Sequence, residues 1–140
     1  MNQPYSQSFV PPAAVIEIRL AALDQAQTAG PFLALIDTGA DASLVPKWVL
    51  LKLGAPSMFE AHLRSPWGEL HVVVMHLADV LIGSERFPAI ELAASESDDE
   101  FVLGRNVLNK LTLFLDGPQQ VTQLLSEPAL QRLRAARIDL

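Results

Sequence analysis

The chain has 140 residues, half of them hydrophobic and 19% of them charged, which suits one domain with a packed core and argues against overall disorder. Its formal net charge of −6 argues against a general nucleic-acid binder, because such proteins need a basic surface to neutralise phosphates. The absence of cysteine excludes disulfides, cysteine-based zinc sites and a thiol nucleophile. No stretch approaches the ~18 apolar residues that span a bilayer, and residues 1–12 do not resemble a secretory signal, so we expect a cytoplasmic protein.

The apolar runs of this chain are short and β-branched, which favours strands over long helices. Residues 1–12 are polar and contain prolines, which predicts a flexible N-terminal arm. Residues 13–23 alternate apolar and charged side chains as a half-buried strand does, and residues 32–36 form its antiparallel partner beyond a turn-rich link. Further apolar runs between turn residues predict strands at 58–63, 69–74, 80–82, 89–92, 111–115 and 121–125.

Short helices are expected at three places in the chain. Residues 47–53 suit a helical turn, and the apolar spacing after Gly104 suits one or two more turns packed on the core. Ser126 is suited to be the N-cap of a final helix that ends at Ile138. No internal repeat and no second domain is visible in the sequence.

An apolar strand that ends abruptly in a polar loop organises the chain. Ile36 leads into Asp37-Thr38-Gly39, which indicates a strand end followed by a tight turn. Gly39 has no Cβ, so backbone or substrate can come close to the Asp37 carboxylate, and the hydroxyl of Thr38 can brace the loop by hydrogen bonding. On this motif alone, Asp37 can also be a carboxylate that only caps a loop or a helix start.

A second apolar run leads into Gly104-Arg105-Asn106 late in the chain. Together with the Asp-Thr-Gly loop, it resembles the paired signature of the retroviral-type (retropepsin-like) aspartic proteases. The resemblance covers roughly residues 13–125 and leaves a helical tail at 126–140. It implies an all-β fold, the closed retropepsin-like β-barrel of a single acid-protease lobe, with one short helix after the Gly-Arg-Asn motif and a C-terminal helix.

The resemblance implies a homodimeric aspartic endopeptidase that takes one Asp37 from each chain, with Thr38 and Gly39 completing each catalytic loop. Two carboxyls about 3 Å apart cannot both ionise, so the pair holds one shared proton. The charged member takes a proton from a water that attacks the peptide carbonyl, and the protonated member supports the oxyanion and protonates the leaving nitrogen. The implied partners are a second copy of the chain and a peptide or protein substrate, without a cofactor or metal.

The resemblance also assigns supporting and substrate-binding residues. Arg105 is implied to pair with Asp41, so that Gly104, Arg105 and Asn106 support the catalytic loop; two independent surface charges are the alternative. The tip of the hairpin at 58–74 corresponds to the family's flap, where Trp67 either covers the substrate and excludes water or packs as core. The implied substrate-binding residues are Leu35, Ala40, Asp41, Ala42, Pro66, Trp67 and Gly68.

Other candidate sites have weaker patterns. Asp116 follows an apolar run and precedes a Gly-Pro pair, which lacks the threonine and fits a hairpin turn, so one active aspartate per chain is expected. His71 and His76 are five apart on a predicted strand and face opposite sides, a poor arrangement for a metal. The glycine-poor flap and the extra C-terminal helix leave another class open, a non-catalytic protein that keeps the fold as a peptide-binding or dimerisation module.

Overall fold

The computed structural model describes residues 1–65 and 67–137. Over these residues the chain is mostly β with short helices, which confirms that part of the fold prediction. In chain order the elements are β1 (Asn2–Pro4), β2 (Val15–Ala21), β3 (Thr28–Ile36), β4 (Ser43–Pro46), α1 (Lys47–Leu53), β5 (Ser57–Arg64), β6 (Leu70–Ile82), β7 (Glu85–Ser95), β8 (Val102–Leu103), α2 (Arg105–Leu108), β9 (Leu113–Asp116), β10 (Val121–Leu124) and α3 (Glu127–Ala135). No helix within the described ranges is long and apolar enough to cross a membrane, and the cytoplasmic location stays a prediction.

The larger sheet contains the hydrophobic core on one of its faces. Among the described residues it has seven strands in the order β2-β3-β8-β4-β7-β6-β5, and β2 also pairs with β6. In β2, Ile16, Ile18 and Leu20 are buried while Glu17 and Arg19 are exposed, which is the period-two pattern of a strand with one core face. Closure of this sheet into a barrel stays a prediction.

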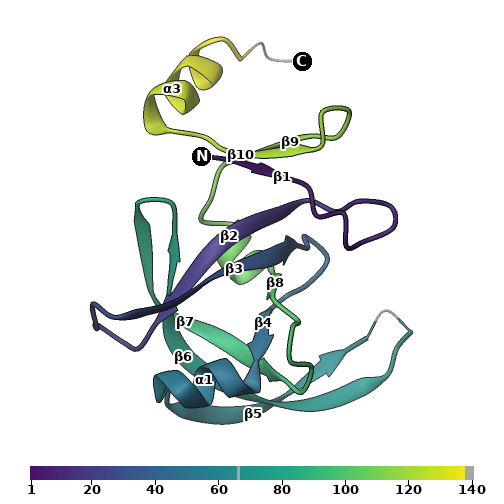
Figure 1. The fold of residues 1–140 in the computed structure, drawn as a ribbon, viewed down its shortest axis with the longest axis vertical. Coiled ribbons are helices and arrows are strands. Elements are labelled where there is room, and N and C mark those ends of the chain that lie inside the picture. Colours follow the sequence, from purple (N-terminus) through teal and green to yellow (C-terminus); the bar gives the residue numbers. More distant parts are fainter. Residues whose placement is uncertain (66, 138–140) are drawn as a thin grey trace.

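β6 is one long strand where the sequence predicts two, at 69–74 and 80–82. Met75 and Ala78, which lie between the two predicted strands, are buried in the core, so the chain continues as a strand there and forms no loop. The first part of β6 pairs with β5 and the second part pairs with β7. The β5–β6 hairpin therefore extends away from the rest of the sheet (Figure 1).

A smaller sheet lies at one end of the molecule (Figure 1). In the described part of the chain it has three strands in the order β1-β10-β9. β1 pairs with β10 from Asn2 to Pro4, so the segment predicted to be a flexible arm is in part a strand. The reason is a long-range backbone pairing, which a polar sequence such as this one does not reveal. The domain boundaries after residues 12 and 125 stay predictions.

The C-terminal helix α3 begins at the predicted N-cap. The hydroxyl of Ser126 accepts a hydrogen bond from the backbone N–H of Ala129 at 3.4 Å, which satisfies one donor of the first turn. None of the residues of α3 is buried. The predicted end of this helix at Ile138 lies outside the described residues.

A buried carboxylate on β6 joins three segments of the fold. Asp79 is 2% exposed, and it accepts hydrogen bonds from the backbone N–H groups of Ala89 at 2.9 Å and Asp24 at 3.1 Å. Arg86 donates to it from Nε at 2.9 Å and forms an ion pair at 2.7 Å. Burial by itself raises the pKa of Asp79, but the hydrogen bonds from Ala89, Arg86 and Asp24 together with the Arg86 charge outweigh it, and the pKa lies below its ordinary value.

We expect Asp79→Asn to lower the free energy of unfolding at pH 7 by about 2 kcal/mol, because it removes hydrogen bonds to a charged group. Because folding lowers the pKa of Asp79, this stabilisation is fully present above the unfolded pKa of about 3.9 and is lost as the pH falls through the folded pKa. Urea unfolding at pH 7 and at pH 3 should therefore show a smaller difference between variant and wild type at pH 3. The exposed Asp98→Asn is the control, and an equal difference for Asp79→Asn at both pH values would contradict the charge-based explanation.

Candidate active site

Two distant segments of the chain meet at the end of β3. β8 lies between β3 and β4 and pairs with both, running parallel to β3. The backbone N–H of Asp37 donates to the carbonyl of Leu103 at 3.0 Å, and that of Leu35 donates to the carbonyl of Phe101 at 2.8 Å. The Asp-Thr-Gly loop therefore lies directly beside the second motif.

The Asp37 side chain is half-buried at the start of this loop. Its Oδ1 accepts a hydrogen bond from the backbone N–H of Gly39 at 2.9 Å. The backbone carbonyl of Asp37 accepts another from the backbone N–H of Ala40 at 3.2 Å. These two bonds close the turn and fix the position of one carboxylate oxygen. Thr38 and Gly39 are exposed, so the tip of the loop is accessible from outside this chain.

Arg105 holds the loop from the second motif. Its backbone N–H donates to the carbonyl of Ala40 at 2.8 Å, and its Nη1 donates to the carbonyl of Thr38 at 2.8 Å. Its Nη2 forms the ion pair with Asp41, whose side chain is 83% exposed against 44% for Arg105. Exposed pairs contribute about 0–1 kcal/mol, so the bonds to the two loop carbonyls hold the loop more firmly than the ion pair does.

Gly104 passes very close to the backbone of the loop. A Cβ at this position would overlap the carbonyl oxygen of Ala42 and lie 2.8 Å from the carbonyl oxygen of Ala40. The φ angle of Gly104 is −93°, which other residues also adopt, so the close approach alone accounts for the glycine.

Ser43 is a site residue that the two motifs do not single out. Its hydroxyl is buried, accepts a hydrogen bond from the backbone N–H of Gly104 at 3.0 Å, and donates one to Oδ1 of Asn106 at 2.8 Å. Nδ2 of Asn106 in turn donates to the carbonyl of Glu91 on β7 at 2.9 Å. One sequence signal points to Ser43, a single hydroxyl at the start of the apolar run that leaves the loop.

A retropepsin-like aspartic protease from Rickettsia conorii has a similar backbone, with a TM-score of 0.57 and 17% sequence identity over 89% of this chain and 88% of that chain. The chain has the retropepsin-like fold. A retroviral protease-like domain of Ddi1 from Leishmania major reaches a TM-score of 0.45 and 13% identity over 79% of this chain and 89% of that chain, too low a score to add support. No protein-family model and no curated protein sequence matches the chain. At such identities the likeness shows the fold alone.

Within this retropepsin-like fold, the β5–β6 hairpin carries the residues predicted to form the flap. Its tip is closed by hydrogen bonds from Gly68 N to Ser65 O at 2.9 Å and from Ser65 N to Glu69 O at 2.8 Å. The side chain of Trp67 is 91% exposed, so it does not pack into the core of this chain. Pro66, the third residue predicted at this tip, lies outside the described residues.

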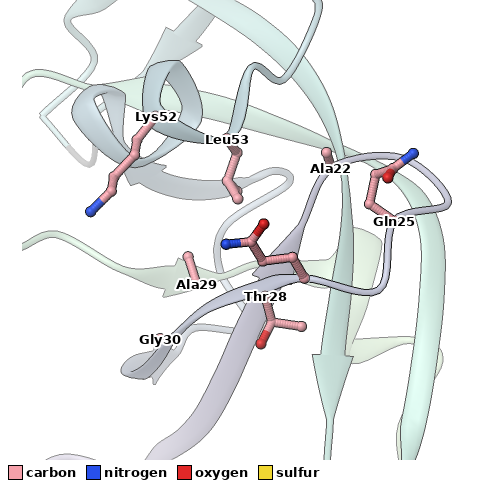
Figure 2. A pocket seen from close by; sticks show the side chains of 8 residues that line it. Ala22, Gln25, Thr28, Ala29, Gly30, Lys52 and Leu53 are labelled. Atoms are coloured by element: carbon pink, nitrogen blue, oxygen red, sulfur yellow. The ribbon is translucent and has the colours of Figure 1, made fainter.

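A hollow in the described part of the surface borders the loop. It has a volume of about 240 Å³ and is lined by Ile36, Thr38, Leu108, Asn109, Leu111, Leu113 and Leu115. Another hollow, of about 450 Å³, contains none of the predicted site residues and is lined by Ala22, Gln25, Gln27, Thr28, Ala29, Gly30, Lys52 and Leu53 (Figure 2). Figure 2 shows the polar ends of Lys52 and Gln25 pointing away from each other.

The remaining candidate residues lie in local structural contacts. Asp116 accepts a hydrogen bond from the backbone N–H of Gln119 at 3.1 Å, within the turn that joins β9 and β10. His76 is buried with Nδ1 3.0 Å from the carbonyl of Ala55, whereas His71 is exposed. In the described part of the chain, these three residues form no hydrogen bond or ion pair with residues 37–41.

Proposed function

We propose that the chain is a homodimeric aspartic endopeptidase in which Asp37 of each copy supplies half of the catalytic pair. The observation that carries the proposal is the braced Asp37-Thr38-Gly39 loop at the end of β3 in a retropepsin-like fold. Its exposed tip supports this function, since catalysis requires a carboxylate that water and a peptide can reach. The pairing of β2 with both β3 and β6 supports a larger sheet that closes as the barrel of this fold.

The need for a second chain follows from the chemistry. Two carboxylates must lie about 3 Å apart to share one proton, and the sequence contains one Asp-Thr-Gly motif. The surface beside the loop supports such an assembly, because Leu115 lines the hollow next to Thr38 and is 47% exposed on the edge strand β9. Phe114 on the same strand is 50% exposed.

In the proposed mechanism, the two Asp37 carboxyls hold one proton and one water between them. The ionised carboxylate accepts a proton from the water as its oxygen attacks the peptide carbonyl carbon. The protonated carboxyl donates a hydrogen bond to the developing oxyanion and then gives its proton to the leaving nitrogen as the C–N bond breaks, so the pair again holds one proton. The Gly39 N–H bond to Oδ1 keeps each carboxylate in the orientation that this geometry needs.

The other predicted site residues have two proposed roles. Gly104, Arg105 and Asn106 hold the catalytic loop through the contacts described above. Leu35, Ala40, Asp41 and Ala42 line the substrate cleft, and the tip of the β5–β6 hairpin with Pro66, Trp67 and Gly68 covers the bound peptide.

We expect Trp67→Ala to raise the KM for peptides several-fold and to change the melting temperature little, because the exposed ring makes no core contact to lose. Trp48→Ala is the matched control, because Trp48 packs against Phe32 and donates to the carbonyl of Asp98, so its loss should lower the melting temperature and leave KM unchanged. A lower melting temperature with unchanged kinetics in Trp67→Ala would show that the flap role is wrong.

The experiment that tests the proposed function is the cleavage of a peptide library by the purified chain over a range of chain concentrations, with products identified by mass spectrometry. We expect cleavage at internal peptide bonds and a rate that rises faster than linearly with chain concentration, because half a site does no chemistry. Intact peptides at a concentration where sedimentation shows a dimer would instead support the non-catalytic peptide-binding module.

A further inference from the structure

We propose that Ser43 is a positioning residue for the catalytic loop, an inference that rests on the proposed function. Its buried hydroxyl links the loop to the second motif and so sets where the Asp37 carboxylate lies. Neither sequence motif contains Ser43, and the ion pair expected to support the loop, Arg105 with Asp41, is largely exposed.

The hydroxyl of Ser43 uses both its donor and its acceptor capacity inside the protein. It is 0% exposed, accepts from the N–H of Gly104 and donates to Oδ1 of Asn106. Asn106 is itself tied to β7 through the carbonyl of Glu91. A chain of three hydrogen bonds therefore connects the second motif to two strands of the larger sheet, β4 and β7.

The hydrogen bonds that hold the loop depend on the position of Gly104, because the residues on both sides of it make them. The residue before it, Leu103, accepts from the N–H of Asp37, and the residue after it, Arg105, donates to the carbonyls of Ala40 and Thr38. A shift of Gly104 would therefore move the backbone on both sides of the carboxylate. Since Ser43 Oγ is the acceptor for the buried Gly104 N–H, its hydroxyl fixes this position.

Alanine at position 43 fits the space that serine occupies but removes the acceptor. The buried Gly104 N–H then loses its acceptor and the half-buried side-chain oxygen of Asn106 loses a donor, which favours a displaced second motif over an unpaired buried N–H. Displacement of a catalytic group by a fraction of an ångström lowers kcat, because the reacting atoms no longer meet in the productive geometry.

The first test compares Ser43→Ala with Ser95→Ala. Ser95 is a matched control, since it is also a buried serine of the larger sheet, and its hydroxyl is bonded to Glu100 at 3.1 Å instead of to a residue of either motif. In Ser43→Ala we expect kcat to fall about 10- to 100-fold with KM within about twofold, and in Ser95→Ala we expect both to stay near wild type. Equal kcat values in folded Ser43→Ala and wild type would overturn the proposal.

The second test needs no enzymatic activity. Amide hydrogen exchange by NMR should become faster for Gly39, Ala40, Gly104 and Arg105 in Ser43→Ala, while the Asp24 and Ala89 amides bound by Asp79 keep their wild-type rates. If Ser43→Ala does not fold, Asn106→Ala removes the other partner of the hydroxyl and should change the same loop amides in the same direction. Unchanged loop amides would overturn the positioning role, whereas a wild-type chain that cleaves no peptide would overturn the proposed function and leave the exchange result to decide the role of Ser43.

Discussion

Asp37→Asn is expected to lower kcat/KM for peptide cleavage by at least about 10³-fold, because an amide can neither accept the proton of the attacking water nor hold the shared proton. Asparagine has nearly the same shape as aspartate, and its side-chain oxygen can still accept the hydrogen bond from Gly39 N–H. The fold and the proposed dimer should therefore survive. The measurement is kcat/KM on a peptide cleaved by the wild type, with circular dichroism and sedimentation on the same samples.

Asp116→Asn is the control for this experiment. Asp116 also lies at the end of an apolar strand, but the hydrogen bond that it accepts from Gln119 lies within the β9–β10 turn. We expect its substitution to leave kcat/KM unchanged. Wild-type activity in folded Asp37→Asn would show that Asp37 is not catalytic. Loss of activity in Asp116→Asn alone would instead indicate a catalytic role for Asp116.

Gly104→Ala is expected to lower the free energy of unfolding by about 3 kcal/mol or more, at the upper end of the range for overpacked sites. The added methyl group would meet the backbone of Ala40 and Ala42, and backbone cannot rotate out of the way as a flexible side chain does. The loop must then separate from the second motif, so activity should be lost in whatever protein remains folded. Urea unfolding and kcat/KM measure the two effects.

Gly117→Ala is the matched control, because a Cβ at Gly117 meets no atom within 4 Å and this glycine does not have a left-handed φ. We expect its stability and activity to stay near wild type. A stable and active Gly104→Ala would show that the loop and the second motif tolerate separation, which would contradict the proposal that residues 104–106 hold the catalytic loop.

The parts of the site that the sequence predicts are those encoded by short contiguous patterns. An apolar run into Asp37-Thr38-Gly39 and another into Gly104-Arg105-Asn106 are visible locally, and the structure brings the two segments together through β8. The hairpin with Trp67 at its tip is likewise marked by apolar runs on either side of turn residues. Ser126 is marked as an N-cap by its position before a helical pattern.

The parts that the sequence does not predict depend on long-range contacts. The polar residues of β1 look disordered until β10 is beside them. In the sequence Ser43 is one small polar residue among others, and its role follows from its contacts with Gly104 and Asn106. Asp79 resembles a break in β6 in the sequence, whereas in the structure it is buried and accepts hydrogen bonds from three donors outside β6. In each case the partner lies in another segment of the sequence, so the local pattern of apolar and polar residues does not reveal the contact.

Mixing wild-type and Asp37→Asn chains tests most directly whether one active site is built from two chains. At a fixed wild-type concentration, excess Asp37→Asn chains should draw the wild type into mixed dimers with one carboxylate. If each mixed dimer is inactive, activity should fall steeply as the inactive chain is added, and Asp37→Asn chains prevented from dimerising should have no such effect. Activity that stays proportional to the wild-type concentration throughout the titration would contradict a shared Asp37 pair.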